Sequence, residues 1–350
     1  MEKTKSVLDH MKSRLGMYVP VQDGKPTGEV WGCLLREIIQ GGIASFRRGE
    51  ATRIEICTDD ASGSFTVSYD GISYSPENLF AMCNGTQTMF TGGMGVWGFG
   101  WYQGLAFPIL NVLSEKFSVE ISNQGVWRTL VCGRGQPGYV EDIKSLFPLP
   151  NRQTIVCFIP NEEYSGGDHD LQHLYNNNLG AMCEAIACAN PGLTVVENKR
   201  VIIRERGMDE VIHAWTAKAG DAPLISFGQV RFGSARVCLA VMPRTVPGRL
   251  VSVRALLDGW EVGRGEFLKR FLGGLSGWLV SCPHLKERNY ECRCVIEGAF
   301  RGNELEHQQY KYIFAGDSAE VTIEPDGPLG KSLGADVNRC WMELFKEYVA

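Results

Sequence analysis

The sequence of 350 residues contains no apolar run of the roughly 18 to 20 residues that a membrane-spanning helix needs. Residues 1–14 alternate charged and apolar side chains in an amphipathic pattern, and they lack the apolar centre of a secretory signal peptide. We therefore expect no membrane contact and a cytoplasmic location.

The sequence also lacks an excess of positive charge. Its 35 Lys and Arg residues are outnumbered by 40 Asp and Glu residues, which gives a formal net charge of −5. The stretches richest in basic residues, 47–53 and 134–144, are diluted by acidic ones. Because a general positive field is what holds a phosphate backbone, we expect no DNA binding by this chain alone.

Residues 84–114 contain no charged side chain and no histidine. Glycines and aromatic residues dominate this segment: Gly85, Gly92, Gly93, Gly95, Gly98, Gly100 and Gly104 with Phe90, Trp97, Phe99, Trp101, Tyr102 and Phe107. Such a segment can bend around a ligand and stack on it, but it offers a triphosphate only backbone N–H groups. The alternative is that the aromatic side chains simply fill a core.

Twelve cysteines are scattered through mostly apolar stretches, which indicates reduced, buried side chains. One group of residues, Cys282, His284, Cys292 and Cys294, has ligands suited to zinc, although its spacing is not that of a zinc finger. His169 and His173 have the i, i+4 spacing of metal ligands on a helix, but a solvated helix start is the simpler interpretation.

The hydrophobic pattern predicts an α/β fold: a largely antiparallel sheet with helices on one face, followed by a second α/β domain. A chain of this length can bury two cores, and we place the domains at 1–220 and 221–350. Expected helices are 5–13, 28–47, 105–114, 168–189, 266–280 and 334–349. Expected strands are 52–58, 64–69, 116–122, 126–132, 153–159, 193–205, 224–232, 235–243, 248–257 and 291–297.

Several short motifs, taken in order, resemble the ATPase fragment found in the B subunits of DNA gyrase and topoisomerase IV. They are Gly16-Met17-Tyr18-Val19, Leu35-Arg36-Glu37-Ile38-Ile39, Thr66-Val67-Ser68-Tyr69-Asp70-Gly71, Asn111-Val112-Leu113-Ser114 and residues 153–160. The resemblance implies a GHKL (Bergerat) α/β sandwich followed by a transducer-like domain of the ribosomal S5-like type.

The positions that use ATP in that family are mostly altered in this sequence. The resemblance makes Glu37 the catalytic glutamate, but Gly41 stands at the magnesium asparagine and Tyr69 at the adenine aspartate. Strand alternation turns Asp70 to the other face, so it cannot substitute without a change of register. At the phosphate-binding glycines, residues 100–106 read Gly-Trp-Tyr-Gln-Gly-Leu-Ala, and Lys331 lies about one residue from the expected transducer lysine. We therefore expect neither ATP nor magnesium as a cofactor, and no ATPase or topoisomerase activity.

The first hypothesis is an enzyme without ATP, in which Glu37 acts as a general acid or base on a small apolar or aromatic molecule in a cyclisation, isomerisation or condensation. Its ligand-binding residues would be Cys33, Gly41, Tyr69, Asp70, Met82, Trp97, Trp101, Tyr102, Gln103 and Thr154. The second is a non-catalytic decoy or a gyrase-binding protein, and the third is an ATP-binding clamp that tolerates the substitutions. The short arm before Gly16 argues against an arm-exchanged dimer, so we expect a monomer or a simple homodimer.

Overall fold

The computed structural model describes residues 6–59, 61–71, 78–85, 105–123, 126–143, 152–165, 179–207, 209–210, 212–213, 217, 225–232, 235–257, 260–262, 266–298 and 321–323. The chain divides into two compact units. The first comprises residues 1–187 and 192–203, and the second comprises 188–191 and 204–350. The units therefore change over at Ile203 and Arg204, whereas the sequence pattern places the boundary after residue 220.

The longest helix of the first unit is α2, Gly28–Arg47, which matches the expected range 28–47. Thr27 precedes it with an extended backbone, and Gly49 follows it with a φ of 74°. The N–H of Gly49 bonds to the carbonyl of Phe46, and the N–H of Glu50 bonds to the carbonyl of Ser45. These two bonds form a Schellman motif, in which glycine supplies the left-handed residue that ends the helix.

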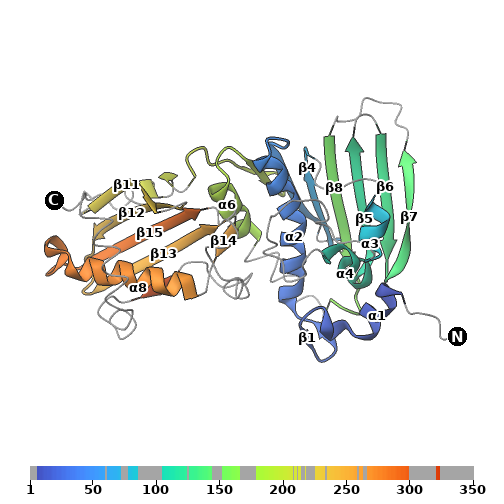
Figure 1. Ribbon diagram of the computed structural model, residues 1–350, viewed down its shortest axis with the longest axis horizontal. Coiled ribbons are helices and arrows are strands. Elements are labelled where there is room, and N and C mark those ends of the chain that lie inside the picture. Colours follow the sequence, from blue (N-terminus) through green and yellow to red (C-terminus); the bar gives the residue numbers. More distant parts are fainter. Residues whose placement is uncertain are drawn as a thin grey trace. The chain divides into compact units, whose positions relative to one another are not determined.

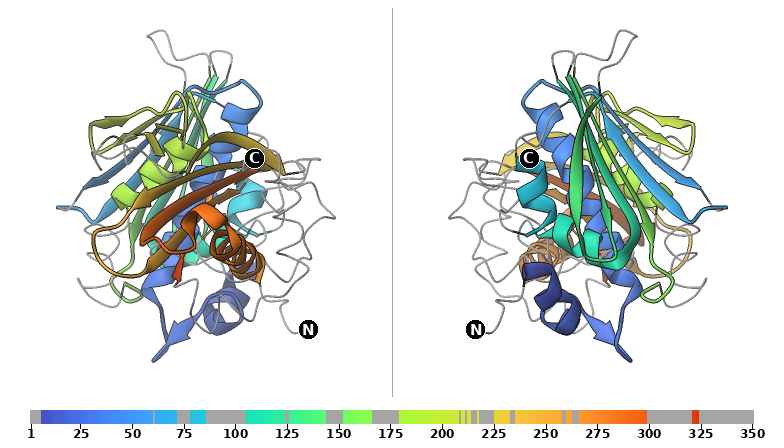
Figure 2. Two further views of the ribbon diagram at one scale, coloured as in Figure 1. Left: turned by 90° about the vertical axis from the view of Figure 1, so that its left-hand side faces the viewer. Right: turned by 90° about the vertical axis from the view of Figure 1, so that its right-hand side faces the viewer.

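The first unit is built on an eight-stranded sheet with the order β10-β9-β3-β4-β8-β5-β6-β7. All neighbouring pairs are antiparallel except β3 with β9, and the strands fan out with the usual twist (Figure 2). Their bounds are β3 Arg53–Asp59, β4 Ser64–Tyr69, β5 Ser114–Asn123, β6 Val126–Gly133, β7 Gln136–Ile143, β8 Arg152–Pro160, β9 Thr194–Glu197 and β10 Arg200–Ile202.

Helices cover one face of this sheet (Figure 1). Helix α2 packs on β3 and β4, and α4, Ala106–Leu113, packs on β5 and β6. Helices α1, Val7–Ser13, and α3, Leu79–Cys83, both pack on α4. A short η1 helix and a small hairpin complete the N-terminal part: η1 Leu15–Met17, β1 Val21–Gln22 and β2 Lys25–Pro26.

Three aromatic rings form the centre of the first core. Phe65 of β4 and Phe158 of β8 are partners across the sheet, with ring centroids 5.0 Å apart and planes 9° apart. Trp31 of α2 stacks on the other side of Phe158, at 6.0 Å and 10°. All three side chains are at most 2% exposed, so this stack joins helix to sheet.

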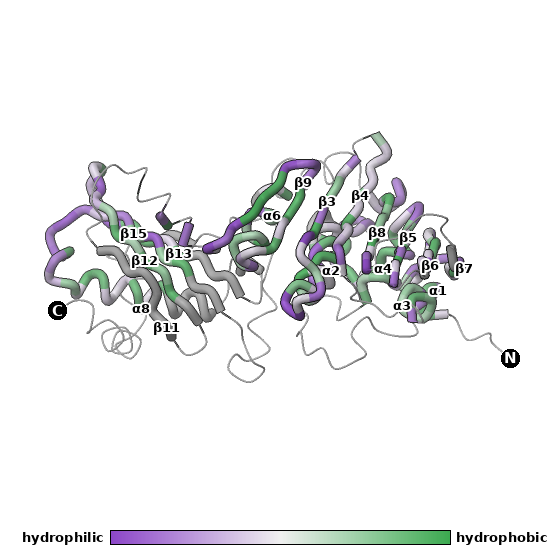
Figure 3. Tube along the Cα trace, turned by 90° about the horizontal axis from the view of Figure 1, so that it is seen from above, coloured by the Kyte–Doolittle hydropathy of each residue, from purple (hydrophilic) through white to green (hydrophobic). Residues whose placement is uncertain are grey.

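Two expectations for the first sheet were wrong in detail. The strand expected at 193–205 is the hairpin β9–β10, turned by Asn198 and Lys199 with φ values of 46° and 76°. Figure 3 shows the hydrophilic turn between these strands. Strand β7, whose sequence QPGYVEDI contains proline, glycine and two acids, was not expected at all.

The second unit holds a six-stranded sheet with the order β11-β12-β15-β13-β14, and β16 also pairs with β13. Helix α8, Glu266–Ser281, packs on β13 (Figure 1), and η4, Pro283–Leu285, follows it. The strands are β11 Ile225–Phe232, β12 Ala235–Pro243, β13 Arg249–Leu257, β14 Trp260–Val262, β15 Tyr290–Gly298 and β16 Val321–Ile323. The sequence predicted β11, β12, β13, β15 and α8, but it did not predict the short strands β14 and β16.

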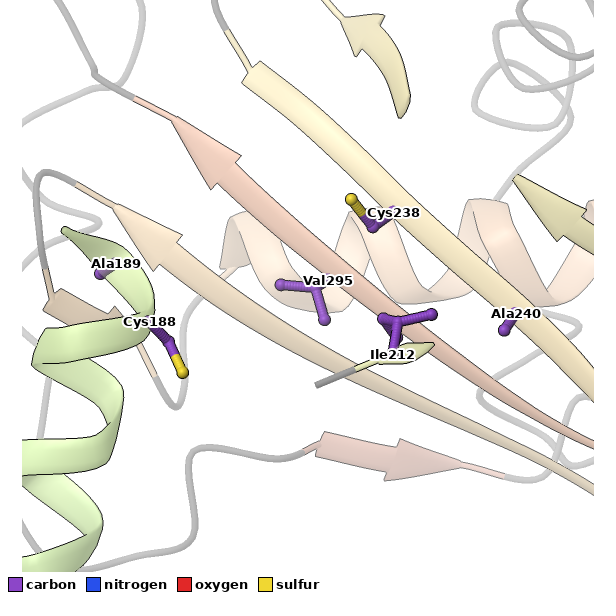
Figure 4. Close-up of a cluster of buried hydrophobic side chains, with 6 residues drawn as sticks. All are labelled: Cys188, Ala189, Ile212, Cys238, Ala240 and Val295. Atoms are coloured by element: carbon purple, nitrogen blue, oxygen red, sulfur yellow. The ribbon is translucent and has the colours of Figure 1, made fainter. Parts of the chain in front are cut away.

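A cluster of small buried side chains lies on one face of the second sheet (Figure 4). Cys238 and Ala240 of β12 lie beside Val295 of β15, together with Ile212 and with Cys188 and Ala189 at the end of α6, Leu179–Ala189. The helix expected at 168–189 is described only over α6. The helix expected at 334–349 lies outside the described residues.

Candidate functional site

Helix α2 carries the three candidate residues Cys33, Glu37 and Gly41 at intervals of four, so they lie along one side of the helix. The adjacent stripe, Leu34, Ile38 and Gly42, faces the sheet: a Cβ on Gly42 would lie 2.8 Å from the Cδ1 of Ile54. One residue of helix rotation is roughly 100°, which places Glu37 on the flank of α2 rather than directly over the strands.

Glu37 is only 4% exposed, and among the residues whose burial the structure describes it is the one charged side chain that is buried. Cys33 on the same stripe is 8% exposed, and Gly41 is also buried. Burying an ionisable carboxyl group is costly, and it makes the protonation state sensitive to what lies nearby. The arrangement therefore places a buried carboxyl group one helical turn after a buried cysteine, with no side chain at position 41.

Tyr69 and Thr154 are partners across β4 and β8. Tyr69 is 2% exposed, and its Cδ1 atom would lie 3.1 Å from a Cβ at Gly42, so its ring lies close against α2. The Thr154 hydroxyl donates a hydrogen bond of 2.8 Å to the carbonyl of Gly71 and is fully buried. The Thr154 hydroxyl therefore stabilises the turn that follows β4.

Asp70 faces away from these residues and is exposed, as the alternation of β4 predicts. Its Oδ1 accepts hydrogen bonds from the N–H groups of Thr52 at 2.7 Å and Arg53 at 2.8 Å, and its Oδ2 accepts one from the Thr52 hydroxyl. Partial burial raises the pKa of the Asp70 carboxyl, but the hydrogen bonds from Thr52 and Arg53 together lower this pKa by more. Asp70 therefore fixes the start of β3.

We expect Asp70→Asn to lower the free energy of unfolding at pH 7 by about 1–2 kcal/mol, because its donors lose a charged acceptor. The folded pKa lies below the unfolded value of about 4, so this stability is present above that value and is lost as the pH falls through the folded pKa. Urea titrations at about pH 7 and about pH 3 should show a smaller deficit at the lower pH.

Asp23→Asn is the matched control, since Asp23 lies in the exposed turn between β1 and β2 at a φ of 51° that asparagine tolerates. Its deficit should stay within about 0.5 kcal/mol at both pH values. An equal deficit for Asp70→Asn at both pH values would contradict a role for the Asp70 charge.

The remaining candidate ligand-binding and metal-binding residues do not lie on α2, β4 or β8. Met82 is buried on α3, which packs against α4, β6 and β7. Trp97, Trp101, Tyr102 and Gln103 lie outside the described residues, as do His169, His173 and Lys331.

Gln40, which the sequence patterns did not single out, is 5% exposed on α2 three residues after Glu37. A buried amide at this spacing lies near Glu37 on the same flank of the helix. The sequence does mark this residue, because Gln40 is a polar residue inside the otherwise apolar run Ile38-Ile39 and Gly41-Gly42-Ile43.

The four residues considered as a zinc site lie on β15 and on the short segment around η4 that precedes it: Cys282, His284, Cys292 and Cys294. Cys292 and Cys294 are fully buried, and desolvation raises the pKa of both thiols well above the ordinary value. Within the part of the chain that the structure describes, no three His, Cys, Asp or Glu side chains are arranged to hold a metal ion. In the same part of the chain, no helix has the length and apolarity needed to cross a membrane.

No protein-family model matches the sequence, and a search of curated proteins finds no significant match. Solved structures do match over nearly the whole chain. The B-subunit of the DNA gyrase from Myxococcus xanthus has a TM-score of 0.59 at 19% identity, and the match covers 98% of this chain and 97% of that one.

Two further structures agree. The topoisomerase IV ATP-binding domain of Francisella tularensis, in complex with a small-molecule inhibitor, has a TM-score of 0.54 at 16% identity and covers 97% of this chain and 92% of its own. The 43K ATPase domain of Thermus thermophilus gyrase B, in complex with an aminocoumarin, has a TM-score of 0.53 at 16% identity, with 97% and 90% covered. The chain therefore has a gyrase-B-like GHKL fold, and the resemblance inferred from the motifs is confirmed at the level of the fold.

Proposed function

We propose that this gyrase-B-like chain no longer hydrolyses ATP, and that it binds and transforms a small apolar or aromatic molecule with Glu37 as general acid or base. The observation that carries the proposal is the burial of Glu37, the one buried charged side chain among the residues whose burial the structure describes. Fold alone does not define function, so the proposal depends on this site. We further propose that the protein acts in the cytoplasm, as a monomer or homodimer and without DNA.

Two substitutions support the loss of ATP use. In the family that the motifs resemble, an asparagine four residues after the glutamate holds magnesium, and Gly41 has no side chain to do so. Tyr69 stands where an aspartate binds adenine, and its ring packs against α2 at Gly42. Losing both polar contacts would cost about 1.5–3 kcal/mol each, which is roughly a hundred- to ten-thousand-fold in affinity.

The same positions suit a different ligand. A desolvated carboxyl group can remove a proton from, or donate one to, a reacting carbon or nitrogen when its pKa is near the working pH. Cys33, one turn before Glu37, and the Gln40 amide, one turn after it, would border such a reaction. A proton-transfer step of this kind needs no nucleotide, which fits an isomerisation, cyclisation or condensation.

The test is calorimetric titration of the whole chain with a non-hydrolysable ATP analogue and magnesium. We expect no binding at micromolar concentrations, because both polar contacts are missing. A micromolar dissociation constant would instead favour an ATP-binding clamp. That second candidate is supported by the match of nearly the full chain to gyrase B and topoisomerase IV ATPase fragments.

A further inference from the structure

Two segments of the second unit meet at one end of its sheet. The turn 244–248 connects β12 to β13, and the segment 286–289 connects η4 to β15. Tyr290, the first residue of β15, is the register partner of Pro243 at the end of β12 and of Arg249 at the start of β13. The two segments are far apart in the sequence, so only the sheet brings them together.

Asn289 holds the turn 244–248 in place. Its carbonyl accepts a hydrogen bond of 3.1 Å from the N–H of Arg244, and its Oδ1 accepts one of 3.0 Å from the N–H of Gly248. The Arg244 guanidinium lies beside this turn, because a Cβ at Gly248 would be 3.6 Å from Nη1 of Arg244. Arg244 is therefore positioned next to the segment that carries Asn289.

Arg249 holds the segment 286–289 from the other side. Its Nε donates to the carbonyl of Arg288 at 3.4 Å, its Nη2 donates to the carbonyl of Lys286, and its Cζ lies 5.9 Å from the centroid of the buried Tyr290 ring. The Arg249 guanidinium therefore stabilises the fold at this point. The side chains of Lys286 and Arg288 are both exposed, and Figure 3 shows their segment as hydrophilic.

Positive charge gathers where these two segments meet. Arg244, Arg249, Lys286 and Arg288, here called the basic cluster, are accompanied by one acid, Glu287, although the chain as a whole has a net charge of −5. Within the part of the chain that the structure describes, no carboxylate pairs with Arg244, Lys286 or Arg288. Because like charges held at one place repel each other, an anionic partner would be attracted to this end of the sheet.

An exposed apolar side chain lies within the same turn. Val246 is 56% exposed, two residues after Arg244 and next to Pro247, which is also exposed. A single exposed valine is ordinary on a protein surface, but this one lies among cations. The segments 243–249 and 283–289 contain no Phe, Tyr or Trp on which nucleic-acid bases would stack. A partner that supplies carboxylates and an aliphatic side chain therefore fits this surface better than a nucleic acid does.

We propose that this end of the second sheet binds an acidic segment of a partner protein, whose carboxylates contact the basic cluster and whose aliphatic side chain covers Val246. Strand β15 lies between β12 and β13, so the backbones at Arg244 and Arg249 are about two strand spacings apart, roughly 10 Å. An extended peptide spans this distance in about three residues, which sets the spacing of its acids. The inference does not depend on the proposed function, because it uses no residue of the first unit.

The test is fluorescence anisotropy of the whole chain with a short labelled peptide that repeats Glu-Leu-Ser. We expect a dissociation constant on the order of 100 μM at low salt, and weaker binding as added salt screens the charges. Arg244→Gln and Arg288→Gln should each weaken binding about threefold, and the double variant about tenfold. Val246→Ser should weaken it by about two- to threefold, because less apolar surface is buried.

Arg134→Gln is the matched control, because it removes the same charge from an exposed arginine of the first unit that pairs with Glu115. Its dissociation constant should equal that of the wild-type chain. An equal loss of affinity in this variant would show that net charge attracts the peptide, and it would overturn the inference. Equal binding of a peptide that repeats Gln-Leu-Ser, or no binding of the acidic peptide at about 1 mM, would do the same. Tighter binding of duplex DNA or of phosphatidylserine vesicles through Arg244 and Arg288 would assign the surface to a different partner and would also overturn it.

Discussion

Replacing Phe158 with alanine should lower the free energy of unfolding by about 3–5 kcal/mol. Phe158 is 1% exposed and lies between Trp31 and Phe65, with ring centroids 6.0 Å and 5.0 Å away. Removing the ring leaves a cavity between α2 and the sheet and ends both stacking contacts at once. Urea unfolding followed by tryptophan fluorescence and circular dichroism measures the loss.

Phe80→Ala is the matched control, because Phe80 is a ring of the same kind on α3 that is 49% exposed. Its effect should stay within about 1 kcal/mol. A similar loss from both variants would show that the stack between α2, β4 and β8 is not the centre of this core.

Glu37→Gln should reduce turnover on the order of a hundred- to ten-thousand-fold, while binding changes by only a few-fold. Glutamine keeps the size and hydrogen-bonding shape of the buried side chain but cannot exchange a proton. The first step is a thermal-shift screen of small aromatic and apolar compounds against the wild-type chain. Conversion of each bound compound is then followed by mass spectrometry with the wild-type chain and the variant.

Glu55→Gln is the control for this measurement. Glu55 lies on β3, is 34% exposed and pairs with Arg53 at 3.2 Å, so its change should leave turnover unaltered. Turnover by Glu37→Gln at the wild-type rate would remove Glu37 from the chemistry. Compounds that bind without being converted, even by the wild-type chain, would favour a non-catalytic binding protein.

The parts of the fold that local patterns determine could be predicted from the sequence. Phe65, Val67 and Tyr69 alternate with polar residues and are buried as expected for β4. The bounds of α2 follow from its apolar period and from Gly49. Strand β7 was not predicted because Pro137 and Gly138 are typical of a loop. The β9–β10 turn was not predicted because neither of its two left-handed residues, Asn198 and Lys199, is a glycine.

The candidate site was predictable only in part, because side-chain partners depend on distant segments. Asp70 matched a motif by position, but its acceptors are used by Thr52 and Arg53, some 18 residues earlier. No local sequence pattern indicates such a hydrogen-bonded pairing.

The close fit of Tyr69 under α2 also limits how this chain can change by single mutations. An aspartate introduced at position 69 would leave the volume of the ring empty and place a carboxylate in an apolar interior. Enlarging Gly42 first would drive a Cβ to 2.8 Å from Ile54 and 3.1 Å from Tyr69. Each change alone therefore disturbs the packing of Tyr69 against α2, so a carboxylate at position 69 is best accommodated when position 42 changes with it.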